Sequence, residues 1–226
     1  MADATTGSGT GLPAAALWDM DGTLVDTEPY WIATEFELAE RYGGTWSTEH
    51  ALNLVGNDLL VSGRYIREHM GIEPSAEEIV ELLLDGVVEK VRREVPWRPG
   101  ARELLADLAA AGVPCALVTM SYRRFVEPIL AGLPAGTFAA VVTGDEVEHG
   151  KPHPAPYLTA AAALGVDPGD CVAIEDSATG VASAVAAGCR VLAVPHHVQV
   201  PAGPGHTSHD TLAGLDARGL WTLVGG

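Results

Sequence analysis

The chain has 226 residues, a hydrophobic content of 47% and a formal net charge of −17 at pH 7. This length suits one large domain or one domain with an insertion, and the composition is that of a globular protein rather than a disordered one. The acidic charge argues against a nucleic acid or an anionic membrane as a partner. No apolar run approaches the ~20 residues that a membrane span needs, and no obligate protein partner is implied.

Residues 1–12 are small and polar, without a basic start or an apolar stretch. They predict a flexible tail and no signal peptide. The three cysteines, Cys115, Cys171 and Cys189, are widely spaced within apolar runs. They indicate reduced thiols in the core and a cytoplasmic protein, and their spacing gives no support for a zinc site.

An apolar run at residues 14–18 predicts a buried strand, and Asp19-Met20-Asp21-Gly22-Thr23 follows it directly. Two carboxylates so close together can divide the work, one attacking or binding a metal while the other exchanges protons with a leaving group. Gly22 is expected where the backbone must approach a ligand. Taken alone, such a pair of acids usually belongs to a solvated loop, so support must come from elsewhere in the chain.

Residues 29–96 contain almost no strand-like run, and they predict helices over 30–42, 59–70 and 76–91, the last beginning near Pro74-Ser75. They form a helical insertion after the first strand, although a subdomain with no role in function would show the same sequence pattern. The aromatic side chains Trp31, Phe36, Tyr42 and Trp46 are expected in the core of this insertion. Trp31, near the hinge, could also face a substrate.

From residue 99 onward, strand-like and helix-like segments alternate. The strands are expected over 114–118, 139–142, 171–174 and 191–194, and the helices over 101–111, 122–130, 155–164 and 179–187. This alternation predicts an α/β fold with a doubly wound parallel sheet and a Rossmann-like core. The core would comprise residues 13–28 and 97–226.

Polar residues follow several of these strands, namely Asp19, Thr119, Lys151 and Asp176. Ligands of such sheets bind beyond the carboxyl ends of the strands, so these side chains are expected to converge. The set suits a phosphate accompanied by a divalent cation. Plainer roles are also open: a strand-end cap for Thr119, a helix N-cap for the Glu175-Asp176 pair, and a surface position for Lys151. The chain has only one other lysine, Lys90, which gives Lys151 extra weight.

Four histidines, His196, His197, His206 and His209, lie in a stretch rich in proline and glycine. A histidine cluster can bind a metal. The spacing is irregular, so a solvated loop is the expected structure.

Four motifs together resemble the haloacid dehalogenase superfamily, in its phosphatase and phosphomutase branch: Asp19-x-Asp21-Gly22-Thr23, Thr119-x-Ser121, Gly150-Lys151-Pro152-x-Pro154 and Glu175-Asp176-Ser177-x-x-Gly180. The resemblance covers about residues 14–195. It implies that residues 29–96 are a helical cap that closes over the active site.

The resemblance also implies the chemistry of each motif. Asp19 would be the nucleophile, and Asp21 would be the general acid and base while its backbone carbonyl binds the metal. The phosphoryl group would be bound by Thr119, by the backbone N–H groups of Met120 and Ser121, and by Lys151.

The implied cofactor is Mg²⁺, whose preferred ligands are carboxylate and water oxygens. It would bridge Asp19 and the phosphoryl group, with Asp176 as the distal ligand. Glu175 would be either a ligand or a supporting partner of the ligands.

Within the superfamily, Asp21 argues against the dehalogenases, which lack a second acid. The insertion's only lysine, Lys90, lies at its far end, which argues against the phosphonatases. The stretch 56–60 has no arginine, which argues against the sugar-phosphate mutases. We therefore expect a Mg²⁺-dependent hydrolase of small phosphomonoesters, including sugar phosphates, with Gly56 and Asn57 among the substrate contacts. The alternatives are a β-phosphoglucomutase-like phosphotransferase and a non-catalytic protein that binds phosphorylated metabolites.

Overall fold

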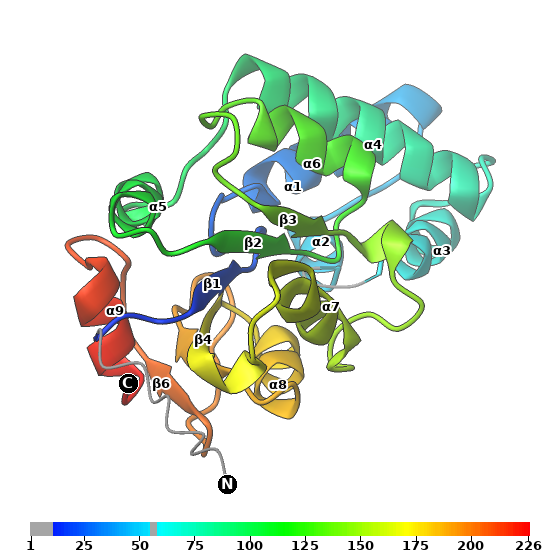
Figure 1. The fold of residues 1–226 in the computed structure, drawn as a ribbon. Coiled ribbons are helices and arrows are strands. Elements are labelled where there is room, and N and C mark those ends of the chain that lie inside the picture. The colour runs from blue at the N-terminus through cyan, green and yellow to red at the C-terminus, as the bar shows by residue number, and fades with distance from the viewer. Residues whose placement is uncertain (1–10, 55–57) are drawn as a thin grey trace, which may run out of the picture.

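A parallel sheet with helices on both faces forms the centre of the computed structural model, which describes residues 11–54 and 58–226 (Figure 1). The strand order is β3-β2-β1-β4-β5-β6, and every pair is parallel. The strands are β1 (Ala15–Trp18), β2 (Cys115–Val118), β3 (Ala140–Val142), β4 (Cys171–Glu175), β5 (Arg190–Ala193) and β6 (His206–Ser208). The chain proceeds outward from β1 in one direction and from β4 in the other, so the switch point of the sheet lies between these two strands.

The apolar runs of the central strands are buried on both faces. In β1, Ala16 and Trp18 pack into one core cluster, whereas Ala15 and Leu17 pack into another. The first cluster includes residues of α5 (Ala101–Ala110), α6 (Arg123–Leu130) and α9 (Ala217–Leu223), and the second includes residues of α7 (Ala155–Leu164) and α8 (Ala178–Ala186). Single 3₁₀ turns occur at Gly144–Glu146 and Pro168–Asp170. The predicted doubly wound α/β fold is confirmed.

Between β1 and α5 the described chain is helical, with α1 (Glu28–Tyr42), α2 (Thr48–Leu52), α3 (Leu59–Met70) and α4 (Ala76–Arg93). Helix α4 begins as the sequence predicts, because Ser75 and Glu78 form a capping box. These helices enclose a small core of their own that includes Leu38, Ile66 and Leu83. They pack on the sheet domain chiefly through α4 and α6 (Figure 1).

The two ends of the helical insertion lie side by side in the structure. Val25 and Trp97 form an antiparallel bridge, and the backbone N–H of Asp26 donates to the carbonyl of Pro96 at 2.8 Å. Two adjacent connections of this kind have the geometry that a hinge requires.

Some expectations from the sequence were wrong. Phe36 and Tyr42 are each 39% exposed and do not belong to the core of the insertion, whereas Trp31 and Trp46 pack against it. The expected loop around His206 contains strand β6, and helices α2 and α9 were not predicted. Among the described residues, no helix is both long and apolar enough to cross a bilayer.

The buried carboxyl group of Glu35 on α1 gives a prediction about stability. Burial raises the pKa of Glu35 to about 8, even though the indole N–H of Trp46 donates to it at 2.9 Å. The folded state therefore holds this proton at pH values where the unfolded chain has released it, so the free energy of unfolding falls as pH rises from about 4.5 to about 8. Glu35→Gln should raise that free energy by on the order of 2–4 kcal/mol at pH 8 and have little effect near pH 4.

Urea unfolding at several pH values checks this, with Glu40→Gln as the control because Glu40 is exposed on the same helix. A Glu35→Gln effect that is independent of pH would contradict the burial argument.

Candidate active site

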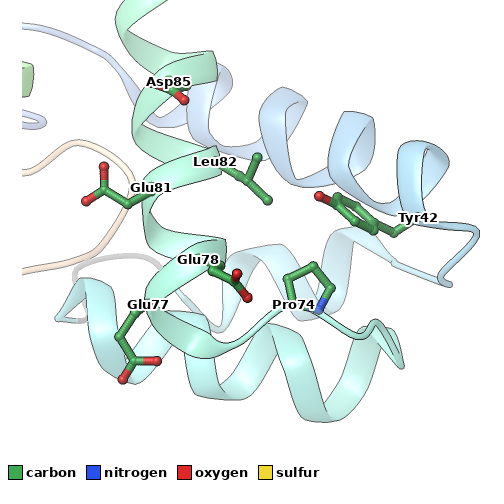
Figure 2. A pocket seen from close by; sticks show the side chains of 7 residues that line it. All are labelled: Tyr42, Pro74, Glu77, Glu78, Glu81, Leu82 and Asp85. Carbon is green, nitrogen blue, oxygen red and sulfur yellow. The ribbon is translucent and has the colours of Figure 1, made fainter.

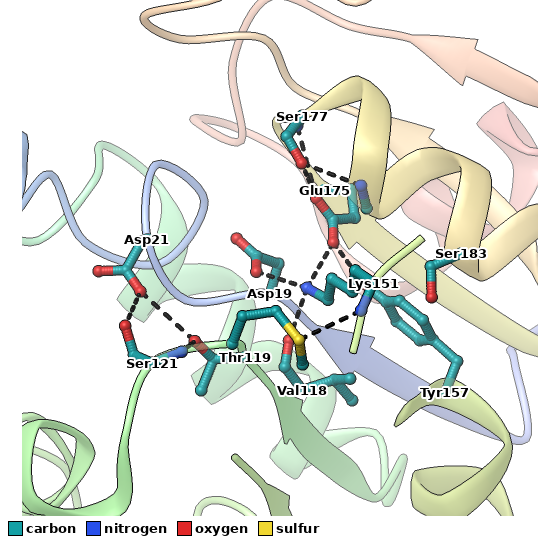
Figure 3. A network of polar contacts seen from close by, with 12 residues as sticks. Asp19, Asp21, Val118, Thr119, Ser121, Lys151, Tyr157, Glu175, Ser177 and Ser183 are labelled. Atoms are coloured by element: carbon teal, nitrogen blue, oxygen red, sulfur yellow. Dashed lines mark hydrogen bonds and ion pairs between the residues drawn. The ribbon is translucent and has the colours of Figure 1, made fainter. Parts of the chain in front are cut away.

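The predicted catalytic residues Asp19, Asp21, Thr119 and Lys151 converge at the carboxyl ends of the central strands (Figure 3). Asp19 and Asp21 follow β1, Thr119 follows β2, and Asp176 follows β4. Lys151 comes from the loop between β3 and α7. This place beside the switch point of the sheet is the expected one for a ligand site in a doubly wound fold.

Lys151 lies in the middle of the cluster, with a side chain that is only 5% exposed. Its Nζ donates to Asp19 Oδ1 at 2.7 Å, to Glu175 Oε1 at 2.6 Å and to the Val118 carbonyl at 2.9 Å. Burial acts to lower the pKa of Lys151, but the two carboxylates outweigh it and raise that pKa above its usual value. The lysine is therefore a fixed buried cation, and a surface position is excluded.

Glu175 is fully buried and holds Lys151 in place. Its carboxylate accepts hydrogen bonds from the hydroxyl of Tyr157 at 2.7 Å and from the hydroxyl of Ser177 at 3.2 Å. A Cβ atom on Gly180 would come within 1.9 Å of Glu175 Oε1, which explains a glycine at this point of the motif. Sequence reasoning missed Tyr157, because a tyrosine in a helix gives no signal of a contact 18 residues away.

Asp19, Glu175 and Asp176 form a carboxylate cluster in which one oxygen of each lies within 4.8 Å of the others. Burial and the charge of Glu175 raise the pKa of Asp19 to about 7, and burial and the charge of Asp19 raise the pKa of Asp176 to about 9. Asp19 Oδ2 is buried and has no hydrogen-bond partner among the described residues. A buried, unpaired carboxylate oxygen among crowded carboxylates fits the oxygen-ligand preference of Mg²⁺.

Gly22 allows the chain to pass close to this cluster. Its φ is +85°, and an added Cβ atom would lie 1.9 Å from Asp176 Oδ2. The glycine expected from a close backbone approach is thus found against a carboxylate of the predicted metal site.

Asp21 faces three hydroxyl groups beside the carboxylate cluster. Thr27 Oγ1 donates to Asp21 Oδ1 at 2.7 Å, while Ser121 Oγ at 2.7 Å and Thr119 Oγ1 at 3.4 Å donate to Oδ2. Burial is the dominant effect on the pKa of Asp21 and raises it, against the lowering by these hydroxyls. Thr27 was not predicted, because nothing in its local sequence distinguishes it from an ordinary residue before a helix.

Three local details bear on the roles expected for Thr119, Ser121 and the Glu175-Asp176 pair. The backbone N–H of Ser121 donates to Thr119 Oγ1 at 3.0 Å, so this group is already engaged and Thr119 does close a local turn. The helix after it begins at Arg123, two residues beyond Ser121. Ser177, rather than the Glu175-Asp176 pair, caps α8 by accepting from the N–H of Gly180.

Other predicted contacts remain predictions. Gly56 and Asn57 lie outside the described residues. The Met120 side chain accepts a hydrogen bond from the backbone N–H of Lys151 at 3.2 Å, which places Met120 beside the lysine loop.

A shallow cavity of about 420 Å³ lies elsewhere, along α4 and the end of α1 (Figure 2). It is lined by Tyr42, Pro74, Glu77, Glu78, Glu81, Leu82 and Asp85. None of the predicted catalytic residues lines it.

Three features characterise one class of enzymes, which sequence comparison identifies. They are a doubly wound α/β core, an acidic site at the switch point of its sheet and a helical insertion after the first strand. The sequence profile of the haloacid dehalogenase-like hydrolases matches residues 16–194. The chain therefore belongs to this family.

Comparison with individual proteins gives the same placement. The chain is 35% identical to hexitol phosphatase B of Escherichia coli (strain K12), over 80% of this chain and 83% of that protein. It is 37% identical to a probable pseudouridine-5'-phosphatase of Drosophila melanogaster, over 79% and 80% of the two chains. Among solved structures, CbbY from Rhodobacter sphaeroides in complex with phosphate superposes with a TM-score of 0.82 at 28% identity, covering 92% of this chain and 99% of that one.

Proposed function

We propose that the protein is a Mg²⁺-dependent phosphatase of small phosphomonoesters, including sugar phosphates, which acts through an aspartyl-phosphate at Asp19. The observation that carries the proposal is the placement of Asp19: Lys151 neutralises one carboxylate oxygen at 2.7 Å, while the other is buried and unpaired among the described residues. The phosphatase names of the two sequence relatives support the same reaction class.

One carboxylate oxygen of Asp19 would attack phosphorus while the other faces the metal, and Lys151 would hold the carboxylate in position. The Lys151 ammonium would also face the charge spread over the phosphoryl oxygens. Asp19, Asp176 and the backbone carbonyl of Asp21 would hold Mg²⁺, which supplies the positive charge needed for two anions to approach each other. Since Glu175 is engaged by Lys151 and Tyr157, we propose that it supports the ligands.

Asp21 would supply the proton. Its raised pKa favours the protonated acid, which would donate to the leaving oxygen. As a carboxylate it would then take a proton from the water that hydrolyses the aspartyl-phosphate. Thr27 and Ser121 would fix the orientation of this side chain through their hydroxyl contacts.

We further propose that two parts of the chain have different roles. Residues 13–28 and 97–226 would carry the chemistry, and residues 29–96 would form a cap that moves on the hinge and selects the substrate. Trp31 packs edge-on against Phe125 of α6, with ring centroids 5.3 Å apart, so it belongs to the contact between these parts. The buried free thiols of Cys115, Cys171 and Cys189 suit a reducing compartment such as the cytoplasm.

Phosphate release from a panel of sugar phosphates and other small phosphomonoesters tests the proposed reaction. Activity should vanish in excess chelator and return with Mg²⁺, because attack by a carboxylate on a phosphate dianion needs a cation. Full activity in chelator would contradict the metal assignment. Conversion of one sugar phosphate into its isomer, without phosphate release, would identify a phosphomutase instead. Binding without turnover would identify a non-catalytic protein.

A further inference from the structure

A second cluster of metal-binding side chains lies at the hinge. Asp26 precedes α1, and His196 and His197 follow β5, so residues 170 apart in sequence meet here. His197 Nε2 lies 2.8 Å from Asp26 Oδ1, and His196 Nε2 lies 3.0 Å from Asp26 Oδ2. These two histidines lie in a loop, as expected, and they also face one carboxylate.

The distances between these side chains are close to those between the ligands of a bound metal ion. One ligand atom of each residue lies within 4.8 Å of the others. Ligand atoms at about 2.0–2.2 Å from a tetrahedral ion are about 3.3–3.6 Å apart, so the 2.8 Å and 3.0 Å contacts between imidazole and carboxylate would open by roughly half an ångström. His196 Nε2 is buried and makes no aligned hydrogen bond with any described residue, despite its closeness to Asp26.

The three side chains are partly open to solvent, although the His196 Nε2 atom itself is buried. The exposed fractions are 31% for Asp26, 23% for His196 and 35% for His197. Three protein ligands with access to solvent leave room for water as a fourth ligand. Two imidazoles with one carboxylate suit transition metals, whereas Mg²⁺ prefers oxygen ligands alone.

We propose that Asp26, His196 and His197 bind a divalent transition-metal ion of the Zn²⁺ type, at a site distinct from the carboxylate cluster around Asp19. The ion would tie the start of the helical insertion to the loop after β5. Since Asp26 also bonds to Pro96 through its backbone, the ion would restrain both connections of the hinge.

Arg98 would compete with the metal ion for His196. Its Nη1 lies 2.8 Å from His196 Nδ1. A guanidinium group only donates hydrogen bonds, so Nδ1 accepts and the proton of the neutral ring is on Nε2. A metal at Nε2 requires that proton on Nδ1, and the contact with Arg98 must then break. Arg98→Met should therefore tighten metal binding severalfold.

The test is a titration of the untagged, metal-free full-length chain with Co²⁺, a spectroscopic substitute for Zn²⁺. It is made in an Asp19→Asn/Asp176→Asn background, which removes the other candidate cation site. We expect one equivalent of Co²⁺ to bind with visible absorption bands of nitrogen and oxygen coordination. His196→Ala/His197→Ala should weaken binding more than ~10-fold, since even supporting partners of metal ligands are worth that much.

The matched control is His149→Ala/His153→Ala, another neighbouring pair whose rings are 4.8 Å apart. It should leave the titration unchanged. Melting temperatures without metal show whether each variant folds, and His197→Gln replaces the double variant if that one does not. Unchanged binding after loss of His196 and His197, or an equal loss in the control pair, would overturn the proposal. So would the absence of one-equivalent binding.

Discussion

Asp19→Asn is expected to lower kcat by at least ~10⁴-fold for every phosphomonoester that the protein hydrolyses, because an amide cannot replace the attacking carboxylate. Asn keeps the size of the side chain and can place its carbonyl oxygen where Oδ1 now meets Lys151. The fold should therefore survive. Removal of one charge from a crowded carboxylate cluster should leave the melting temperature unchanged or raise it.

Steady-state kinetics and thermal unfolding on the same preparation check this result. Mass spectrometry must show that residue 19 has not deamidated, because a trace of restored Asp19 would mimic residual activity. Turnover within tenfold of the unmodified protein, in a verified Asn variant, would rule out covalent catalysis by this residue.

The second large effect is expected at Lys151. Lys151→Met keeps most of the side-chain volume but leaves Asp19 and Glu175 facing each other without the buried cation. Loss of a preorganised donor to the developing charge costs about 3 kcal/mol, which corresponds to a roughly 100-fold fall in kcat. The free energy of unfolding should also fall, by roughly 3–5 kcal/mol at neutral pH without added metal, because two buried carboxylates lose their partner.

Lys90→Met is the matched control, since Lys90 is the other lysine of the chain and pairs only with the exposed Glu37 among the contacts described for it. Its kcat should stay unchanged. Near-normal kcat in Lys151→Met would mean that the lysine is structural and does not act on the reaction.

The sheet could be predicted from the sequence because its strands are buried on both faces. Runs such as Cys115–Val118 and Cys171–Glu175 are almost wholly apolar, and the polar residues directly after them mark the carboxyl ends of the strands. Strand β6 escaped prediction because His206, Thr207 and Ser208 are polar residues on the edge of the sheet. Helix α2 has only five residues, too few for a helical period to show.

The site residues that belong to sequence motifs could be predicted. The contacts between residues far apart in the sequence could not. The positions of Asp19, Lys151 and Asp176 follow from their places after strands. The contacts of Tyr157 with Glu175 and of Thr27 with Asp21 depend on how α7 and α1 pack, which no local pattern encodes. The meeting of Asp26 with His196 and His197 likewise needs the whole sheet in place.

The central claim is that a phosphoryl group passes through Asp19, and trapping that intermediate tests it most directly. The protein would be mixed with a hydrolysed phosphomonoester and Mg²⁺, quenched within the first turnover, and treated with borohydride, which reduces an acyl phosphate to an alcohol. Peptide mass spectrometry should then find homoserine in place of Asp19, and no such change in the Asp19→Asn variant or at Asp21. Phosphate release in the first turnover with Asp19 unmodified, or reduction at a different carboxylate, would contradict the account.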